Sequence, residues 1–129
     1  MDVKSREEII KFAQKLNSTN LSPLRSGNIS LRTQNSSNEE GFLITPSGKK
    51  YDSLKADDIV FVSLKGNYDE KGLQPSSEWR FHKDIYLNKT DAKAVVHAHS
   101  PHATAVSAHN KDIPAFHYMI ALAGGDNIK

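Results

Sequence analysis

Apolar residues recur at helical spacing near the N-terminus, over residues 5–16. Five of them fall close to the i, i+3, i+4 and i+7 positions of one helix face, with charged residues between them: Ile9, Ile10, Phe12, Ala13 and Leu16. Ser5, followed three residues later by Glu8, has the pattern of an N-cap with a capping box. The pattern predicts an amphipathic helix, and the polar stretch 17–27 predicts a loop after it.

Four other segments have the alternating or β-branched pattern of strands: residues 27–32, 42–45, 59–64 and 94–99. The polar residues 33–40 separate the first two, which predicts a hairpin. One helical turn is expected over 54–58.

Two further helices are expected. Residues 76–89 carry apolar and aromatic side chains at helical spacing, with Ser76 or Ser77 as the N-cap. Ser100 and Pro101 have the pattern of an N-cap followed by the first helical position, and that helix runs to about residue 108. Residues 114–122 read as a short strand or loop passing into a helix that Gly124-Gly125 ends. Because helices and strands are mixed along the chain, we expect an α/β fold with an antiparallel or mixed sheet flanked by helices.

Composition excludes several classes of protein. The 129 residues suit one domain, and the lack of cysteine excludes disulfides, thiolate zinc sites and cysteine nucleophiles and suits a cytoplasmic location. The net charge of +2 is too small to indicate nucleic acid or an anionic membrane as a partner. No apolar run approaches the roughly 20 residues of a membrane span, and the N-terminus is too charged for a secretory signal.

The apolar content is low for a folded domain. It is 37% with Tyr counted, and counting Gly in place of Tyr still leaves it below the roughly 45–50% that is typical. Two explanations are open: apolar surface is buried against other subunits, or part of the fold is missing.

The pair His97 and His99 is the sharpest candidate for chemistry. Residues two apart on a strand point to the same face, so the two imidazoles could bind one divalent ion. The alternative is a pair of surface or hydrogen-bonded histidines. The apolar residues 94–96 before the pair favour a metal, because histidines at the end of a buried strand need partners.

Two short segments and one helix start could surround an anion. Ser76 and Ser77 precede Glu78 at the start of the expected helix 76–89, where unpaired backbone N–H groups favour negative charge. The segments 27–30 and 45–48 offer small and hydroxyl residues at strand ends, which can wrap a phosphate. For each of these, an ordinary cap or hairpin turn explains the same residues.

Four other residues have a weaker pattern. Tyr118, after His117 in an apolar stretch, could donate a proton or could be a core aromatic residue. His82, His102 and His109 are interpreted as structural or solvent-facing residues on helices.

Taken together, these segments resemble the class II aldolase/adducin family over about residues 5–128. The matching motifs follow the family's order: GNISLR, LITPSGKKYDSL, DDIVFVSLKG, PSSEWRFH, AVVHAHSPHATAV and IPAFHYMIALAGG. The combination of PSSEW with HxH about twenty residues later is the most specific part. The resemblance implies a three-layer α/β fold, with residues 1–129 forming the N-terminal portion of one family domain whose C-terminal part is absent from this sequence.

The resemblance also implies roles for individual residues. His97 and His99 resemble two of three histidine ligands of one Zn²⁺ per subunit, and Glu78 resembles the catalytic acid/base, which can also bind the metal. The residues that match the family's phosphate site are Asn28, Thr45, Ser47, Gly48, Ser76 and Ser77. Tyr118 matches a proton donor that reaches a neighbouring subunit's site, within a homotetramer.

The implied reaction is zinc-dependent cleavage of a ketose 1-phosphate into dihydroxyacetone phosphate and an aldehyde. Zn²⁺ would act as a Lewis acid on the carbonyl and adjacent hydroxyl oxygens. The family's third histidine lies beyond residue 129, with His102 and His117 as possible substitutes, so we expect weak zinc binding by this chain alone. The alternatives are a non-catalytic adducin-like module and a dehydratase or epimerase. Both HxH histidines and Glu78 argue against the module, and Glu rather than Asp at position 78 argues against an epimerase.

Overall fold

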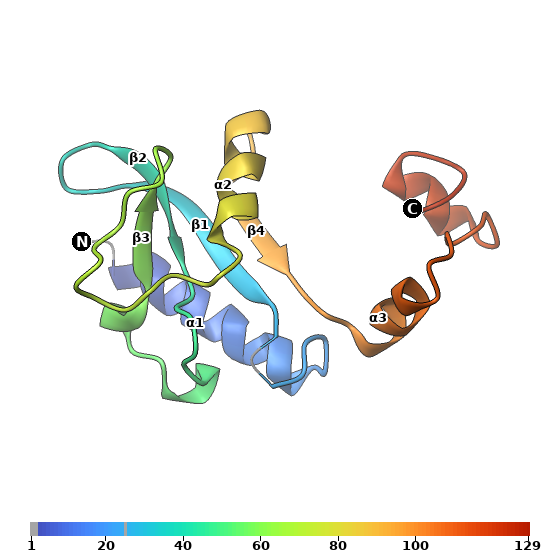
Figure 1. Cartoon of the computed structure of the whole chain (residues 1–129), viewed down its shortest axis with the longest axis horizontal. Helices are drawn as coiled ribbons and strands as arrows, with labels where there is room; N and C mark the ends of the chain where they lie inside the picture. The colour runs from blue at the N-terminus through green and yellow to red at the C-terminus, as the bar shows by residue number, and fades with distance from the viewer. Residues whose placement is uncertain (1–2, 25) are drawn as a thin grey trace.

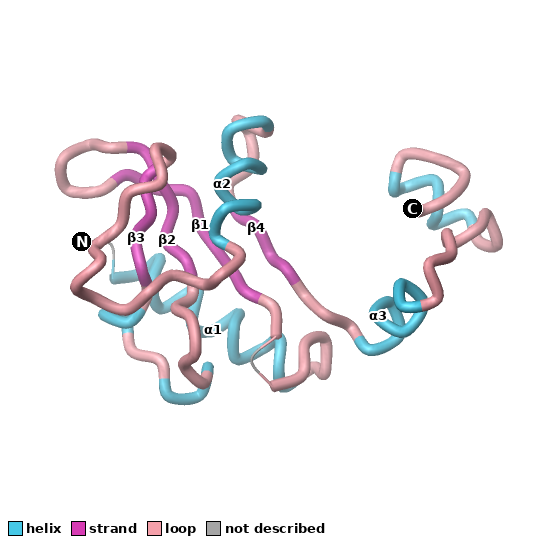
Figure 2. Tube along the Cα trace, viewed as in Figure 1, coloured by secondary structure: helices cyan, strands magenta, loops and turns pink. Residues whose placement is uncertain are grey.

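A four-stranded antiparallel sheet forms the centre of the molecule. In a computed structural model, which describes residues 3–24 and 26–129, the strand order is β3-β2-β1-β4 (Figures 1 and 2). The strands are β1 (Asn28–Gln34), β2 (Glu40–Ile44), β3 (Val60–Ser63) and β4 (Ala94–His97). The predicted hairpin is confirmed, since Ser30 of β1 pairs with Ile44 of β2. On its other side β1 pairs with β4, and Asn28 lies opposite His97.

Helices cover both faces of this sheet, as the three-layer α/β expectation required. The helical elements are α1 (Val3–Ser18), η1 (Tyr51–Ser53), η2 (Ala56–Asp58), α2 (Trp79–Asn88), α3 (Pro101–Ala108) and η3 (Tyr118–Ala123), where η denotes a 3₁₀ helix. The apolar side of α1 packs with Ile29 and Leu43 on one face. On the opposite face, α2 packs Trp79 and Tyr86 against a separate cluster that includes Phe42.

Alternation along β1 divides its side chains between these two layers. Ile29 and Leu31 belong to the cluster beneath α1. The buried polar residues Asn28 and Ser30 contact side chains of α2 and its N-cap instead. Because successive strand residues point to opposite faces, a single strand supplies apolar packing on one side and polar groups on the other.

Three local predictions were wrong at element ends. Helix α1 already includes Val3, so Ser5 lies inside it and is not its N-cap. Helix α2 starts at Trp79 with Glu78 as its N-cap, because residues 76–79 form a turn in which the Ser76 carbonyl accepts from the Trp79 amide. The expected turn at 54–58 is a 3₁₀ helix at 56–58, preceded by another at 51–53. By contrast, the Ser100 cap of α3 is confirmed, since its hydroxyl accepts from the Ala103 amide.

The C-terminal segment extends away from the sheet (Figure 1, orange to red). No residue of α3 is buried, and within 101–129 only Ile120 is. Several large apolar side chains there are exposed, including Phe116, Tyr118 and Leu122. The low apolar content of the sequence and this exposure both mean that few apolar side chains are buried within the chain itself. Within the described residues no helix is long and apolar enough to cross a membrane.

Gly27 lies where the chain enters β1, and we expect its replacement by Ala to be strongly destabilising. A Cβ at position 27 would lie 2.5 Å from the Ser22 hydroxyl and 2.6 Å from the His97 carbonyl, at a φ of +80°. Overpacking costs about 1–3 kcal/mol and the left-handed conformation about 1–2 kcal/mol. Urea unfolding should therefore show a loss of about 3 kcal/mol.

The matched control is Gly48→Ala. Gly48 also has a positive φ, +74°, but nothing lies within 4 Å of an added Cβ. Only the conformational cost applies there, about 1–2 kcal/mol. Equal losses for the two variants would contradict the close packing at Gly27.

Candidate metal and phosphate site

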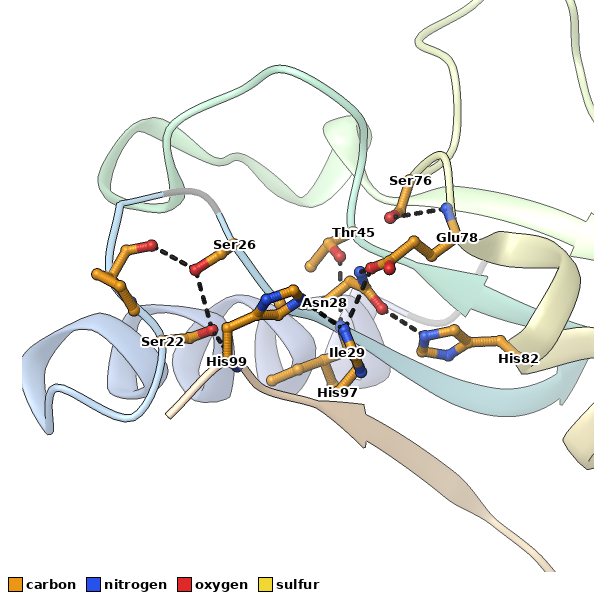
Figure 3. Close-up of polar contacts among 12 residues, drawn as sticks. Ser22, Ser26, Asn28, Ile29, Thr45, Ser76, Glu78, His82, His97 and His99 are labelled. Carbon is orange, nitrogen blue, oxygen red and sulfur yellow. Dashed lines mark hydrogen bonds and ion pairs between the residues drawn. The ribbon is translucent and has the colours of Figure 1, made fainter. Parts of the chain in front are cut away.

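Three possible metal ligands converge at one end of β1 and β4. The Nε2 atoms of His97 and His99 lie 2.7 Å apart, and His97 Nε2 is 3.5 Å from Glu78 Oε2. One ligand atom from each of the three residues lies within 4.8 Å of the others. Figure 3 shows the three side chains gathered around Asn28.

Each of the three residues is placed by a different part of the fold. His97 is the last residue of β4, and its ring makes an edge contact with the Phe81 ring on α2. His99 lies beyond the end of the strand, so strand geometry alone does not bring it to His97. Its backbone N–H donates to the buried Ser22 hydroxyl at 3.0 Å, which fixes the chain after β4. Glu78 stands at the N-terminal end of α2.

The donor set matches the chemistry of a zinc site. Two imidazole nitrogens and one carboxylate oxygen are ligands that Zn²⁺ accepts, and catalytic zinc sites commonly have three protein ligands and one open position. All three residues are partly exposed, so solvent reaches the group. His102 and His117 do not join it in the described part of the chain, because both lie in the exposed C-terminal segment.

Glu78 is the first of five side chains that are joined by a row of hydrogen bonds between α2 and β1. Asn28 Nδ2 donates to Glu78 Oε2 at 2.5 Å, and Asn28 Oδ1 lies 2.5 Å from His82 Nε2. His82 Nδ1 contacts the Ser30 hydroxyl at 2.7 Å, and that hydroxyl contacts the Tyr86 hydroxyl at 2.8 Å. The sequence interpretation of His82 as structural did not reveal this link to the candidate metal ligands.

Burial keeps His82 neutral. Desolvation and, to a smaller extent, the nearby His97 lower its pKa from 6.5 to about 4, while Glu78 acts in the opposite direction. Burial likewise raises the pKa of the Tyr86 hydroxyl. Both side chains are therefore uncharged near neutral pH.

A polar cavity of about 220 Å³ adjoins Glu78 and His99. Five of the six residues predicted to bind phosphate line it: Asn28, Ser47, Gly48, Ser76 and Ser77. Thr45 does not line it. Its buried hydroxyl accepts from the Ile29 amide at 3.3 Å, and its carbonyl accepts from the Ser76 amide. Thr45 thus connects the segments that form the cavity.

Lys49 and Tyr51 also line the cavity, and neither residue was among those predicted from the sequence to bind phosphate. Lys49 Nζ lies 2.6 Å from Asp58 Oδ1. Burial would raise the pKa of Asp58, but the hydrogen bond and charge of Lys49, with the Lys55 backbone, lower it. The Tyr51 hydroxyl donates to the Gly27 carbonyl.

Tyr118 is not part of this constellation within one chain. It lies in η3, and 78% of its surface is exposed. Its predicted role in a neighbouring subunit's site stays a prediction.

Comparison with known proteins identifies the family. A family model described as "Class II Aldolase and Adducin N-terminal domain" matches residues 7–129. The chain belongs to this family. The resemblance expected from its motifs is thereby confirmed.

Several class II aldolases are similar to this chain. L-fuculose phosphate aldolase from Escherichia coli is 46% identical over 125 residues, which are 97% of this chain and 55% of that protein. A 5-methylthioribulose-1-phosphate/5-deoxyribulose-1-phosphate aldolase from Rhodospirillum rubrum is 41% identical over 96% of this chain and 53% of its own length. A solved L-fuculose 1-phosphate aldolase matches with a TM-score of 0.82 and 35% identity, over 98% of this chain and 57% of that structure. The chain spans about half the length of these relatives.

Proposed function

We propose that the protein cleaves a ketose 1-phosphate into dihydroxyacetone phosphate and an aldehyde, with Zn²⁺ as its metal. The convergence of Glu78, His97 and His99 beside a polar cavity is the observation that carries this proposal. The relatives named for fuculose phosphate and for ribulose 1-phosphates differ in the sugar, but each name specifies a phosphorylated sugar and an aldolase. We therefore propose a ketose 1-phosphate without specifying the aldehyde half.

Each residue of the site would have a separate role in this reaction. His97 and His99 would hold the zinc ion, which supplies Lewis-acid polarisation of the substrate carbonyl. Glu78 would move a proton at the carbon that becomes the nucleophile in the reverse, condensing direction. Ser76, Ser77 and the turn at 47–49 would bind the phosphate and so fix the reacting carbons beside Glu78.

The exposed apolar side chains of residues 101–129 support a further part of the proposal. Phe116, Tyr118 and Leu122 are each more than 70% exposed, and contact with other subunits would bury them. We include in the proposal a homotetramer in the cytoplasm, in which Tyr118 donates a proton at a neighbouring subunit's site.

The direct test is product analysis with the whole protein. NMR after incubation with L-fuculose 1-phosphate and with 5-deoxyribulose 1-phosphate should show dihydroxyacetone phosphate and an aldehyde in at least one case. An epimerised or dehydrated product would replace the proposal with the alternative reactions. No turnover of either sugar by a folded, zinc-loaded protein would support the non-catalytic module instead.

Zinc affinity should depend on both histidines of the HxH pair. Replacing His97 or His99 by Ala removes a proposed ligand, so each variant should lose more than the roughly 10–100-fold affinity that an outer-shell partner contributes. Isothermal titration with Zn²⁺ measures this. His109→Ala, on the exposed end of α3, is the control and should bind like the parent. Unchanged affinity in both HxH variants would place the metal elsewhere.

Lys49 should contribute to phosphate recognition. Lys49→Met removes the ammonium group of a residue that lines the cavity, and a hydrogen bond to a charged group contributes about 1.5–3 kcal/mol. We expect KM for the ketose 1-phosphate to rise about tenfold or more, with a smaller change in kcat. Lys50→Met is the matched control because Lys50 does not line the cavity. A KM that rises equally in both variants would argue against a specific contact.

A further inference from the structure

The row of hydrogen bonds that starts at Glu78 forms because the spacing of side chains along α2 matches the spacing along β1. Glu78, His82 and Tyr86 are four residues apart at the start and along one side of α2. Asn28 and Ser30 are two residues apart on β1. Four helical residues rise about 6 Å and two strand residues about 6.6 Å, so helix and strand groups interleave in register. All but Glu78 are buried, with 3% exposure for Asn28 and none for Ser30, His82 and Tyr86.

The donors and acceptors in this row can be assigned from its Glu78 end. A carboxylate only accepts, so the Asn28 group facing Glu78 Oε2 must be the amide nitrogen. The Asn28 oxygen therefore faces His82 Nε2, and that nitrogen must donate. In the neutral imidazole the other nitrogen, Nδ1, then accepts from the Ser30 hydroxyl. Ser30 in turn accepts from the Tyr86 hydroxyl.

We propose that His82 is a positioning residue for the aldol reaction, which fixes the Asn28 amide so that its nitrogen holds the Glu78 carboxylate at the metal site. This inference rests on the proposed function. Ser30 and Tyr86 favour the His82 tautomer that carries its proton on Nε2. This Nε2–H group then requires the Asn28 oxygen, and not its nitrogen, to face His82. Without the His82 donor the Asn28 amide can turn over, and its oxygen would then repel the carboxylate.

The arrangement also connects the two halves of the proposed site. Asn28 has two amide hydrogens, and one is used by Glu78. Asn28 also lines the cavity assigned to phosphate. An amide held in one orientation thus keeps a donor toward the carboxylate and leaves its second donor for the cavity side.

Kinetics of the whole protein test this role with two variants of similar size. His82→Leu removes both hydrogen bonds, and kcat for aldol cleavage should fall about 10–100-fold, as for loss of other groups that orient metal ligands, with a smaller rise in KM because Asn28 also lines the phosphate cavity. His82→Gln restores a donor toward Asn28 and an acceptor toward Ser30, so it should recover kcat to within about threefold of the parent. His109→Leu, on the exposed α3, is the control and should match the parent. A Leu variant with the parent's kcat, or a folded Gln variant as slow as the Leu variant, would overturn the proposal.

An NMR measurement keeps the test independent of activity and of the folding of the Leu variant. In the unsubstituted protein, nitrogen shifts of His82 should identify the Nε2–H tautomer, and the Asn28 side-chain amide protons should exchange slowly. Ser30→Ala should reduce the population of that tautomer. A His82 in the Nδ1–H form would overturn the positioning role even in an active aldolase. The expected spectra in a protein that cleaves no sugar phosphate would leave the hydrogen-bond assignment standing and the proposed function refuted.

Discussion

Replacement of Glu78 by Gln is expected to leave the fold intact and to lower kcat for ketose 1-phosphate cleavage by about 10²–10⁴-fold, the usual contribution of a positioned acid or base. The side chain of Glu78 is 37% exposed and makes no cap hydrogen bond with α2. A Gln side chain can still accept from Asn28 through its oxygen, so the local packing survives. It cannot take up a proton, so the proposed transfer is lost.

The measurement is steady-state cleavage, with dihydroxyacetone phosphate as the detected product. Glu8→Gln is the matched control because Glu8 is exposed on α1, on the opposite side of the sheet from α2. Urea unfolding of Glu8→Gln should agree with the parent within about 0.5 kcal/mol, as for exposed substitutions generally, and Glu78→Gln should still unfold in one cooperative transition. If Glu78→Gln kept kcat within threefold of the parent, another group would have to be the acid/base.

The second large effect is on the pH dependence of stability. In the absence of metal, the free energy of unfolding should fall by up to about 3 kcal/mol as the pH decreases from about 6.5 to about 4. The pKa of His82 is about 4 in the folded protein, against its ordinary value of 6.5, which applies to the unfolded chain. Between these values the unfolded chain binds one proton more than the folded chain, so stability rises with pH. Below about pH 4 both states are protonated at His82, and its contribution stops changing.

Urea unfolding at several pH values, with a chelator present, measures this dependence. The His82→Gln variant has no titrating group at this position, so its curve should be flatter between pH 4 and 6.5 by the amount stated. The difference between parent and variant removes the contributions that are common to both proteins. The lowered pKa of Asp58 causes a loss only below its usual value of 3.8, outside this window. Parallel curves for the two proteins would mean that His82 titrates alike in both states.

Much of the architecture follows from short-range patterns in the sequence. The alternation in 27–32, the apolar run in 42–45 and the polar stretch between them were enough to predict the hairpin. Ser100 and Pro101 predicted the start of α3 because capping depends on neighbouring residues alone. Ser5 is not the N-cap because α1 already includes Val3, upstream of the apolar face of the helix. A capping pattern in the sequence does not exclude a helix start further upstream.

The candidate site was predictable where its residues lie in short motifs. His97 and His99 were selected by residue type and spacing, and Glu78 by its place in the Pro-Ser-Ser-Glu-Trp motif. The row through Ser30, His82 and Tyr86 was not, because it depends on contacts between α2 and β1 that join residues 52 or more positions apart. Thr45 was selected for its hydroxyl, but the backbone of Ile29 already occupies that group. Lys49 became visible only through its place at the cavity.

Strand β1 places apolar side chains on one face of the sheet and polar side chains on the other, and this limits where residues can be inserted into the chain. A residue inserted within β1 would turn every following side chain to the opposite face, which would exchange Ile29 and Leu31 with the polar groups that support Glu78. The tip of the hairpin is different: the Asn35 side chain accepts from the amides of Ser37 and Glu39 in a local turn that touches neither core. Natural length variation among such chains should therefore concentrate at 36–38 and be absent from 28–31.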